Sequence, residues 1–89
     1  MINSEYYLIT FSSTHNCISA EGFLKEKQVK VKLIPLPSAI SSGCGFALKI
    51  LPKDVLSVTP FLDVPQLKEA QFFKLKKEEG KLYVDKWIF

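Results

Sequence analysis

The sequence predicts an α+β fold that forms one domain over residues 1–89. Short runs of aromatic and β-branched residues alternate with stretches whose apolar residues recur every three or four positions. The order of these elements is strand, helix, strand, strand, helix, strand. The length suffices for a single modest core and is too short for a second.

The first strand and the first helix are expected between residues 6 and 28. Residues 6–11 are rich in aromatic and β-branched side chains and suit a central strand. Residues 12–14 are hydroxyl residues of the kind that cap helix N-termini. From there to about Gln28 the spacing predicts a helix, with Phe23 at the margin of its apolar stripe. The stripe itself consists of Cys17, Ala20 and Leu24.

Two strands are expected on either side of a small, glycine-containing loop. Residues 29–33 alternate apolar residues with lysines and are followed by Pro35 and Pro37, which is typical of an edge strand. The loop occupies residues 41–45. Residues 46–51 have little polarity on either face, which predicts a central strand.

The last third of the chain predicts a second helix and a hairpin. Pro52 and Asp54 suit the first turn of the helix, Pro60 is expected to kink or split it, and Pro65 to end it. Its apolar side is expected to contain Val55, Leu56, Val58, Phe61 and Leu62. Residues 72–77 and 81–88 are expected to form the hairpin, around a turn at residues 78–80.

This order matches the ferredoxin-like βαββαβ sandwich, with an extra C-terminal strand that forms the terminal hairpin. In that topology the first helix returns the chain to the end of the sheet where it started. We therefore expect the loop of residues 41–45 to lie at the same end of the sheet as the start of the first helix.

The loop contains the candidate reactive residue, Cys44. Gly43 and Gly45 flank it, and Ser41 and Ser42 precede it, so the backbone can turn several N–H groups toward one anion. A thiolate is such an anion and is the nucleophilic form of cysteine, so this loop would lower the thiol pKa below its ordinary value of about 8.5. A simple turn that contains a cysteine by chance explains the same residues equally well.

The expected topology adds Ser13, Thr14 and His15 to the candidate substrate-binding residues, because the unpaired N–H groups of a helix start stabilise a nearby anion. His15 is either a base for Cys44 or, as helical spacing favours, a solvent-facing side chain. Cys17 is either a redox partner of Cys44 or a core residue, and its place on the apolar stripe favours the core.

Composition argues against several functional classes. The net charge of +3 comes from twelve lysines spread along a chain without arginine, which argues against nucleic-acid binding. No run approaches the ~20 apolar residues of a membrane span, and the first residues lack the pattern of a signal peptide, so a cytoplasmic location is expected. Two cysteines and one histidine do not make a closed metal site, and no phosphate or dinucleotide motif indicates a cofactor.

Three segments resemble a family of small bacterial domains described as selenium/sulfur carrier-like proteins. The three are residues 7–15, residues 31–37 and the Ile-Ser-Ser-Gly-Cys-Gly loop of residues 40–45, which is the most specific element, and the shorter pieces 20–21, 24–26 and 47–48 match as well. The resemblance covers roughly the first 60 residues. It implies that Cys44 carries sulfur or selenium as a persulfide or selenosulfide, between donor and acceptor proteins, as a carrier more than as an enzyme. It also implies alanine where this chain has Cys17.

Two alternatives use the same fold differently. In the first, the chain is a non-catalytic binding or regulatory module whose apolar ending, Trp87, Ile88 and Phe89, is buried by another protein or by a second copy through the C-terminal hairpin. In the second, Cys17 and Cys44 form the disulfide of a redox sensor.

Overall fold

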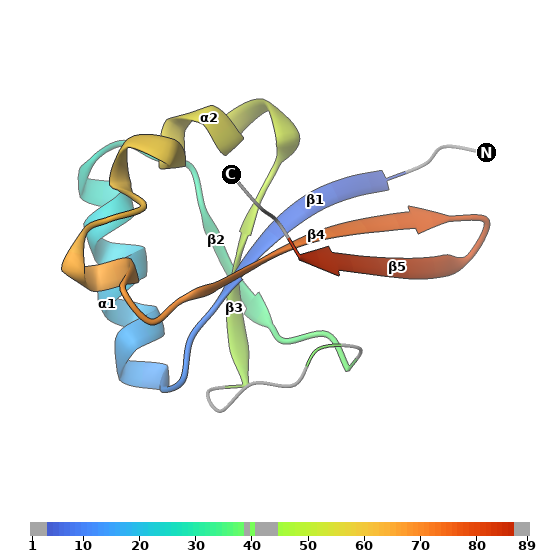
Figure 1. Ribbon diagram of the computed structural model, residues 1–89, viewed down its shortest axis with the longest axis horizontal. Helices are drawn as coiled ribbons and strands as arrows, with labels where there is room; N and C mark the ends of the chain where they lie inside the picture. Colours follow the sequence, from blue (N-terminus) through green and yellow to red (C-terminus); the bar gives the residue numbers. More distant parts are fainter. Residues whose placement is uncertain (1–3, 39, 41–44, 87–89) are drawn as a thin grey trace.

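The computed structural model describes residues 4–38, 40 and 45–86. Within these residues, a five-stranded antiparallel sheet has the strand order β2-β3-β1-β4-β5, and the helices pack on one of its faces (Figure 1). The main elements are β1 Ser4–Thr10, α1 Thr14–Glu26, β2 Lys32–Pro35, β3 Phe46–Ile50, α2 Val55–Val58, β4 Gln71–Glu78 and β5 Lys81–Lys86. The α+β class and the terminal hairpin are confirmed. The strand order differs from that of a four-stranded βαββαβ sheet, and β5 pairs with β4 at one edge.

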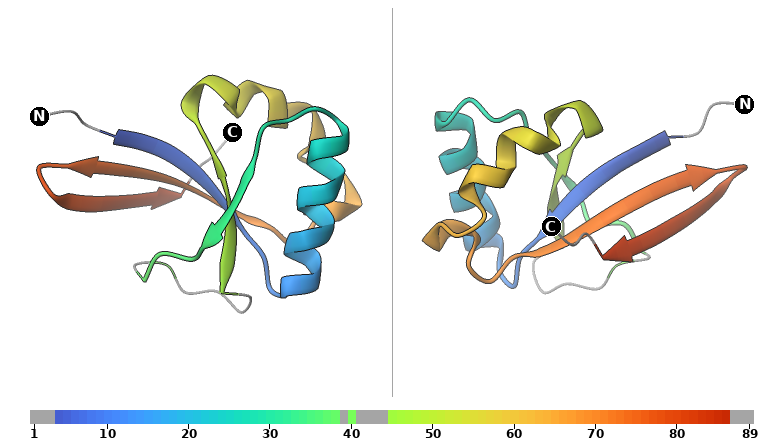
Figure 2. Two further views of the ribbon diagram at one scale, coloured as in Figure 1. Left: turned by 180° about the vertical axis from the view of Figure 1, so that it is seen from behind. Right: turned by 45° about the horizontal axis from the view of Figure 1, so that its top comes forward.

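Helix α1 begins where the cap residues predict it. Ser13 is the N-cap, and its Oγ accepts a hydrogen bond of 3.2 Å from the backbone N–H of Asn16. The predicted stripe is confirmed, since its three side chains are fully buried: Cys17, Ala20 and Leu24. Figure 2 shows α1 standing beside the sheet along most of the height of β2 and β3.

The expected start of the edge strand at residue 29 is wrong. Lys27 is the C-cap of the helix, and Gln28 after it adopts a φ of 64°. The N–H of Val29 then donates a hydrogen bond of 2.9 Å to the carbonyl of Leu24. Val29 is therefore buried as part of the helix end, and β2 starts only at Lys32. Its position at the edge of the sheet, paired only with β3, is as predicted.

Each face of the sheet has its own apolar cluster. Toward the helices, Ile9 of β1 and Leu48 of β3 pack with the α1 stripe, Val58 and Leu67. On the opposite face, Leu8 of β1 packs with a smaller cluster of Ile40, Ala47 and Leu75. Because β1 and β3 are buried on both faces, both are central strands, as their sequences predict.

The second helix is much shorter than predicted. It consists of the single turn α2, preceded and followed by 3₁₀ turns at Pro52–Asp54, Thr59–Phe61 and Pro65–Leu67. A proline stands at or next to the start of each 3₁₀ turn, because its fixed φ suits a first turn and its missing N–H breaks a continuing helix. Pro60 thus splits the helix as expected, whereas Pro65 begins a turn instead of ending one. Leu56, expected on the apolar side, is 77% exposed.

The terminal hairpin turns on two residues instead of the expected three. Glu78 pairs with Lys81, and the loop residues Glu79 and Gly80 have φ values of 51° and 82°. Positive φ at both positions is the signature of a type I′ turn, whose twist matches that of the flanking strands. Strand β5 ends at Lys86, and the apolar ending of residues 87–89 lies outside the described residues.

Candidate functional site

The candidate site lies where β2 ends and β3 begins. Four of the predicted site residues, Cys44 among them, lie outside the residues that the structure describes: Ser41, Ser42, Gly43 and Cys44. Ile40, just before this segment, is 6% exposed, and its N–H donates to the carbonyl of Pro37 at 3.0 Å. Gly45, just after it, has a φ of 75° and accepts a hydrogen bond of 2.9 Å from Leu36. The loop is therefore anchored at both described ends.

The described ends of this loop and the start of α1 lie at the same end of the sheet, as the topology predicts. Thr10, the last residue of β1, pairs with Ala47, the second residue of β3, so β1 leads into α1 at the end of the sheet where β3 begins (Figure 1). Thr14, the first residue of α1, lines a cleft together with Phe46.

That cleft is apolar and has a volume of about 280 Å³. Its lining comes from the first turns of α1, from β2 and from the first residue of β3: Thr14, Cys17, Ile18, Leu33 and Phe46. Ile18 is 54% exposed and Phe46 is 38% exposed, so the mouth of the cleft presents apolar surface to solvent. Next to Gly45, the described surroundings are thus hydrophobic, whereas the sequence predicts a polar environment for an anion.

The three predicted residues at the helix start have different environments. The Ser13 hydroxyl is half-buried and holds the N-cap of α1. Thr14 is exposed at the edge of the apolar cleft. His15 is exposed to solvent, as helical spacing predicts. Its partnership with Cys44 stays a prediction, because Cys44 lies outside the described residues.

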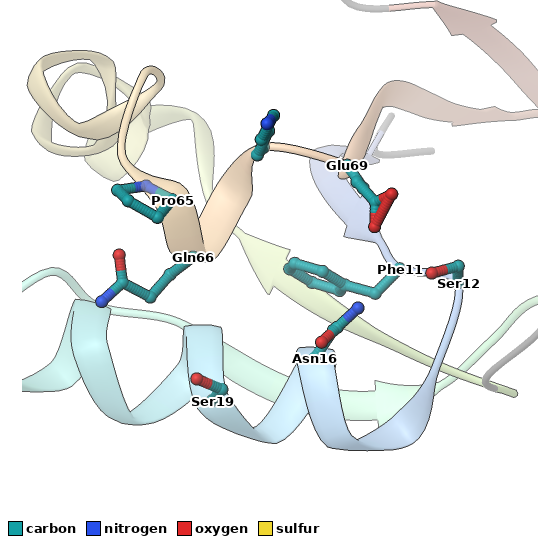
Figure 3. Close-up of a pocket in the computed structure, with 8 residues that line it drawn as sticks. Phe11, Ser12, Asn16, Ser19, Pro65, Gln66 and Glu69 are labelled. Carbon is teal, nitrogen blue, oxygen red and sulfur yellow. The ribbon is translucent and has the colours of Figure 1, made fainter.

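A second, polar hollow of about 480 Å³ lies between α1 and the Pro65–Leu67 turn (Figure 3). Its lining residues are Phe11, Ser12, Asn16, Ser19, Pro65, Gln66, Lys68 and Glu69. Figure 3 shows the Phe11 ring between the Gln66 side chain at one end and Ser12 with Glu69 at the other. Neither Gly45 nor Phe46 lines this hollow, so it is a separate feature of the helix face.

Two apolar residues of the site were missed from the sequence, Ile18 and Phe46. For both residues, the local sequence offered an indication of exposed apolar surface. Ile18 is a large apolar residue that falls off the buried stripe of α1, and Phe46 follows directly after the glycine that closes the loop. Large apolar residues at exposed positions beside a loop are typical of surfaces that contact other molecules.

The family comparison covers both the loop and the helix start. The family model described as "Putative Se/S carrier protein-like" matches residues 6–74, which is more than half of the 89-residue chain. The chain belongs to this family. The match extends past the first 60 residues into β4 and stops before β5. Neither the curated proteins nor the solved structures give a significant match.

Two further classes of feature were sought in the described part of the chain. No three His, Cys, Asp or Glu side chains gather there in a way that would hold a metal ion. Among the helices described above, none is both long and apolar enough to cross a lipid bilayer.

Replacing Gly45 by alanine is expected to lower the free energy of unfolding by about 1 kcal/mol, because an L-residue with a Cβ is strained at its φ of 75°. A Cβ built there meets no atom within 4 Å, so the cost is conformational and not steric. Urea denaturation measures it.

The matched control is Gly22→Ala in α1, where a Cβ is equally uncrowded and φ is helical. It is expected to raise stability by about 0.5–1 kcal/mol, because alanine favours a helix over glycine. Equal signs for the two substitutions would contradict the left-handed conformation of Gly45.

Proposed function

We propose that this member of the Se/S carrier-like family carries sulfur or selenium on Cys44, as a persulfide or a selenosulfide. The observation that carries the proposal is the family match over residues 6–74, which includes the whole Ser-Ser-Gly-Cys-Gly loop. The positive φ of Gly45 supports it, since this conformation turns successive N–H groups toward one side of the chain.

The transfer step needs no external oxidant or reductant. The Cys44 thiolate attacks the terminal sulfur of a donor persulfide, a new S–S bond forms at Cys44, and the donor's own S–S bond breaks. The donor leaves as a thiolate and takes the negative charge with it. The new Cys44 persulfide then loses its proton to solvent, which leaves a negative charge on the terminal sulfur. An acceptor thiolate then removes that sulfur by the same exchange. A selenium atom passes in the same way and leaves a selenosulfide between the two steps.

The loop residues have a supporting role in this proposal. Backbone N–H groups of Ser41, Ser42, Gly43 and Gly45 would stabilise the terminal anion, as donors do in an oxyanion hole. Ser13, Thr14 and His15 would add the positive end of the α1 dipole at the same rim. The chain acts here as a carrier and not as a catalyst on a small substrate.

Donor and acceptor proteins are the proposed partners, and the cytoplasm, where thiols are kept reduced, is the proposed compartment. The exposed Ile18 and Phe46 support protein partners, because exposed apolar side chains are typical of surfaces that become buried in protein–protein contacts. We also propose that the sheet is a ferredoxin-like sandwich with one added strand, which the position of β1 between β3 and β4 supports.

The test is an intact-mass measurement after incubation with a small-molecule persulfide. The wild-type chain is expected to gain the mass of one sulfur atom, and a reducing thiol is expected to remove it. Cys44→Ala is expected to gain nothing.

Cys17→Ala is the matched control and should gain the adduct like the wild type, because Cys17 is fully buried. A wild-type chain whose Cys44 alkylates readily but never takes up sulfur would rule the proposal out. An adduct that survives in Cys44→Ala would move the function to another residue.

A further inference from the structure

Strand β5 forms one edge of the sheet, and no strand among the described residues pairs with its outer side (Figure 1). An uncovered edge presents a row of backbone N–H and C=O groups that another strand can pair with. The opposite edge, β2, carries Pro35, which blocks such pairing. Strand β5 has no proline, and it exposes two large side chains: Leu82 at 37% and Tyr83 at 48%.

The two-residue turn fixes which backbone groups of β5 point outward. In an antiparallel hairpin, hydrogen-bonded and non-hydrogen-bonded pairs alternate, and the residues that flank a two-residue turn form a hydrogen-bonded pair. Lys81 flanks the turn and pairs with Glu78. Lys81, Tyr83 and Asp85 therefore direct their backbone groups toward β4, and the residues between them, Leu82 and Val84, direct theirs outward.

The charges of β5 complement each other when the strand meets its own copy. A two-fold axis at Tyr83 places Lys81 opposite the partner's Asp85, and Leu82 opposite the partner's Val84. Leu82 and Val84 are then the hydrogen-bonded positions, as their outward backbone groups require. Moving the axis to Leu82 or to Val84 loses this pairing, because Lys81 or Asp85 then faces the partner's Tyr83.

Lys81 and Asp85 are also available for such a contact. Across the hairpin, Lys81 pairs with Glu78 and Asp85 with Lys74. However, Glu78 forms an ion pair with Lys76, with 3.4 Å between Oε2 and Nζ. Lys74 forms one with Glu5, with 3.4 Å between Nζ and Oε2. In the described part of the chain, neither Lys81 nor Asp85 takes part in an ion pair.

We propose that two copies of this chain pair through β5, antiparallel and centred on Tyr83, to form a continuous ten-stranded sheet. Strand β5 lies outside the residues that the family model matches, so the proposed interface lies outside them too. In the dimer the two β3 strands are seven strand spacings apart, on the order of 30 Å, so the proposed interface lies far from the start of each β3. The inference is independent of the carrier proposal.

A contact of six residues a side is small compared with a standard interface of about 800 Å² per partner, so the dimer is expected to dissociate on dilution. Sedimentation equilibrium of the full chain between about 1 μM and 1 mM covers this range of affinities. Wild type is expected to pass from monomer to dimer over it. A wild-type chain that stays monomeric throughout overturns the proposal.

The register is tested by charge reversal. Lys81→Asp and Asp85→Lys each place like charges opposite one another twice in the homodimer, and each is expected to weaken dimerisation at least about tenfold. An equimolar mixture of the two variants restores both ion pairs, one in its original sense and one reversed, so it is expected to form a heterodimer as well as wild type does. Lys30→Asp, an exposed lysine outside the sheet, is the matched control and should dimerise like wild type.

Dimers that persist in both variants, or folded variants that do not associate when mixed, overturn the register. Thermal unfolding shows whether each variant is folded, since both substitutions also face β4. If either is not, Val84→Pro decides, because it removes an outward N–H and leaves the pairing with β4 in place. Val84→Pro is expected to be monomeric, and a wild-type-like dimer would overturn the proposal.

Discussion

Replacing Leu48 by alanine is expected to lower the free energy of unfolding by about 2–5 kcal/mol. Leu48 is fully buried in β3 between Ile9 and Leu33 on the neighbouring strands, and it belongs to the cluster that joins the sheet to α1. The substitution removes apolar atoms from this cluster and leaves a cavity that close-packed neighbours refill only in part. Since a domain of this size has a total stability of about 5–15 kcal/mol, the loss is a large fraction of it.

Urea denaturation followed by circular dichroism measures the change, and Leu56→Ala is the matched control. Leu56 is 77% exposed, so the same substitution there is expected to change stability by less than about 0.5 kcal/mol. The control also tests the fold, because the sequence pattern places Leu56 on the buried side of the second helix. A large loss for Leu56→Ala would support the regular helix that the pattern predicts, against the broken one of the structure.

The elements that the sequence predicts well are those whose burial is set by the local pattern. In β1, Leu8 and Ile9 are both fully buried on opposite faces, which is what an unbroken apolar run in a central strand means. In α1, hydroxyl residues before an apolar stripe identify both the cap and the buried face. No distant partner has to be known for either conclusion.

Residues 52–70 were predicted poorly because tertiary contacts decide their conformation. The three-and-four spacing of their apolar residues suggests one helix, but Phe61 instead meets Phe23 of α1 edge-on, with the ring centroids 5.7 Å apart at 84°. The alternating spacing of Val29 and Val31 likewise predicted a strand from residue 29, which the structure does not show. Val29 follows the helix cap and is buried by it, so an alternating pattern there does not mean a strand.

The end of the sheet at which the described ends of the loop lie was predicted correctly, whereas the apolar cleft beside them was not. Topology alone brings the described ends of the loop to the start of α1, which the pairing of Thr10 with Ala47 confirms. The apolar cleft of Ile18 and Phe46 was not predicted, because it needs the relative position of a helix and two strands. The relative position of a helix and two strands is set by tertiary packing, and no periodic pattern in the sequence encodes it.

Replacing Ile40 by alanine is expected to lower the free energy of unfolding by about 2–4 kcal/mol and to slow the alkylation of Cys44. Ile40 is 6% exposed and packs with Leu8, Ala47 and Leu75 on the face of the sheet away from the helices. It is the last described residue before the loop, so its packing fixes where the loop begins. In the proposed carrier site the loop N–H groups stabilise the Cys44 thiolate, and loss of this anchor is expected to weaken that stabilisation.

The expected slowing is about two- to fivefold near neutral pH, which corresponds to the 0.3–1 kcal/mol by which oriented N–H groups stabilise a nearby charge. Alkylation with a small haloacetamide, followed by intact mass, measures the rate in folded protein. Ile18→Ala is the matched control: Ile18 is 54% exposed, so its loss should leave stability within about 0.5 kcal/mol of wild type. An Ile40→Ala chain that is destabilised but alkylates at the wild-type rate would show that the reactivity of Cys44 does not depend on an anchored loop.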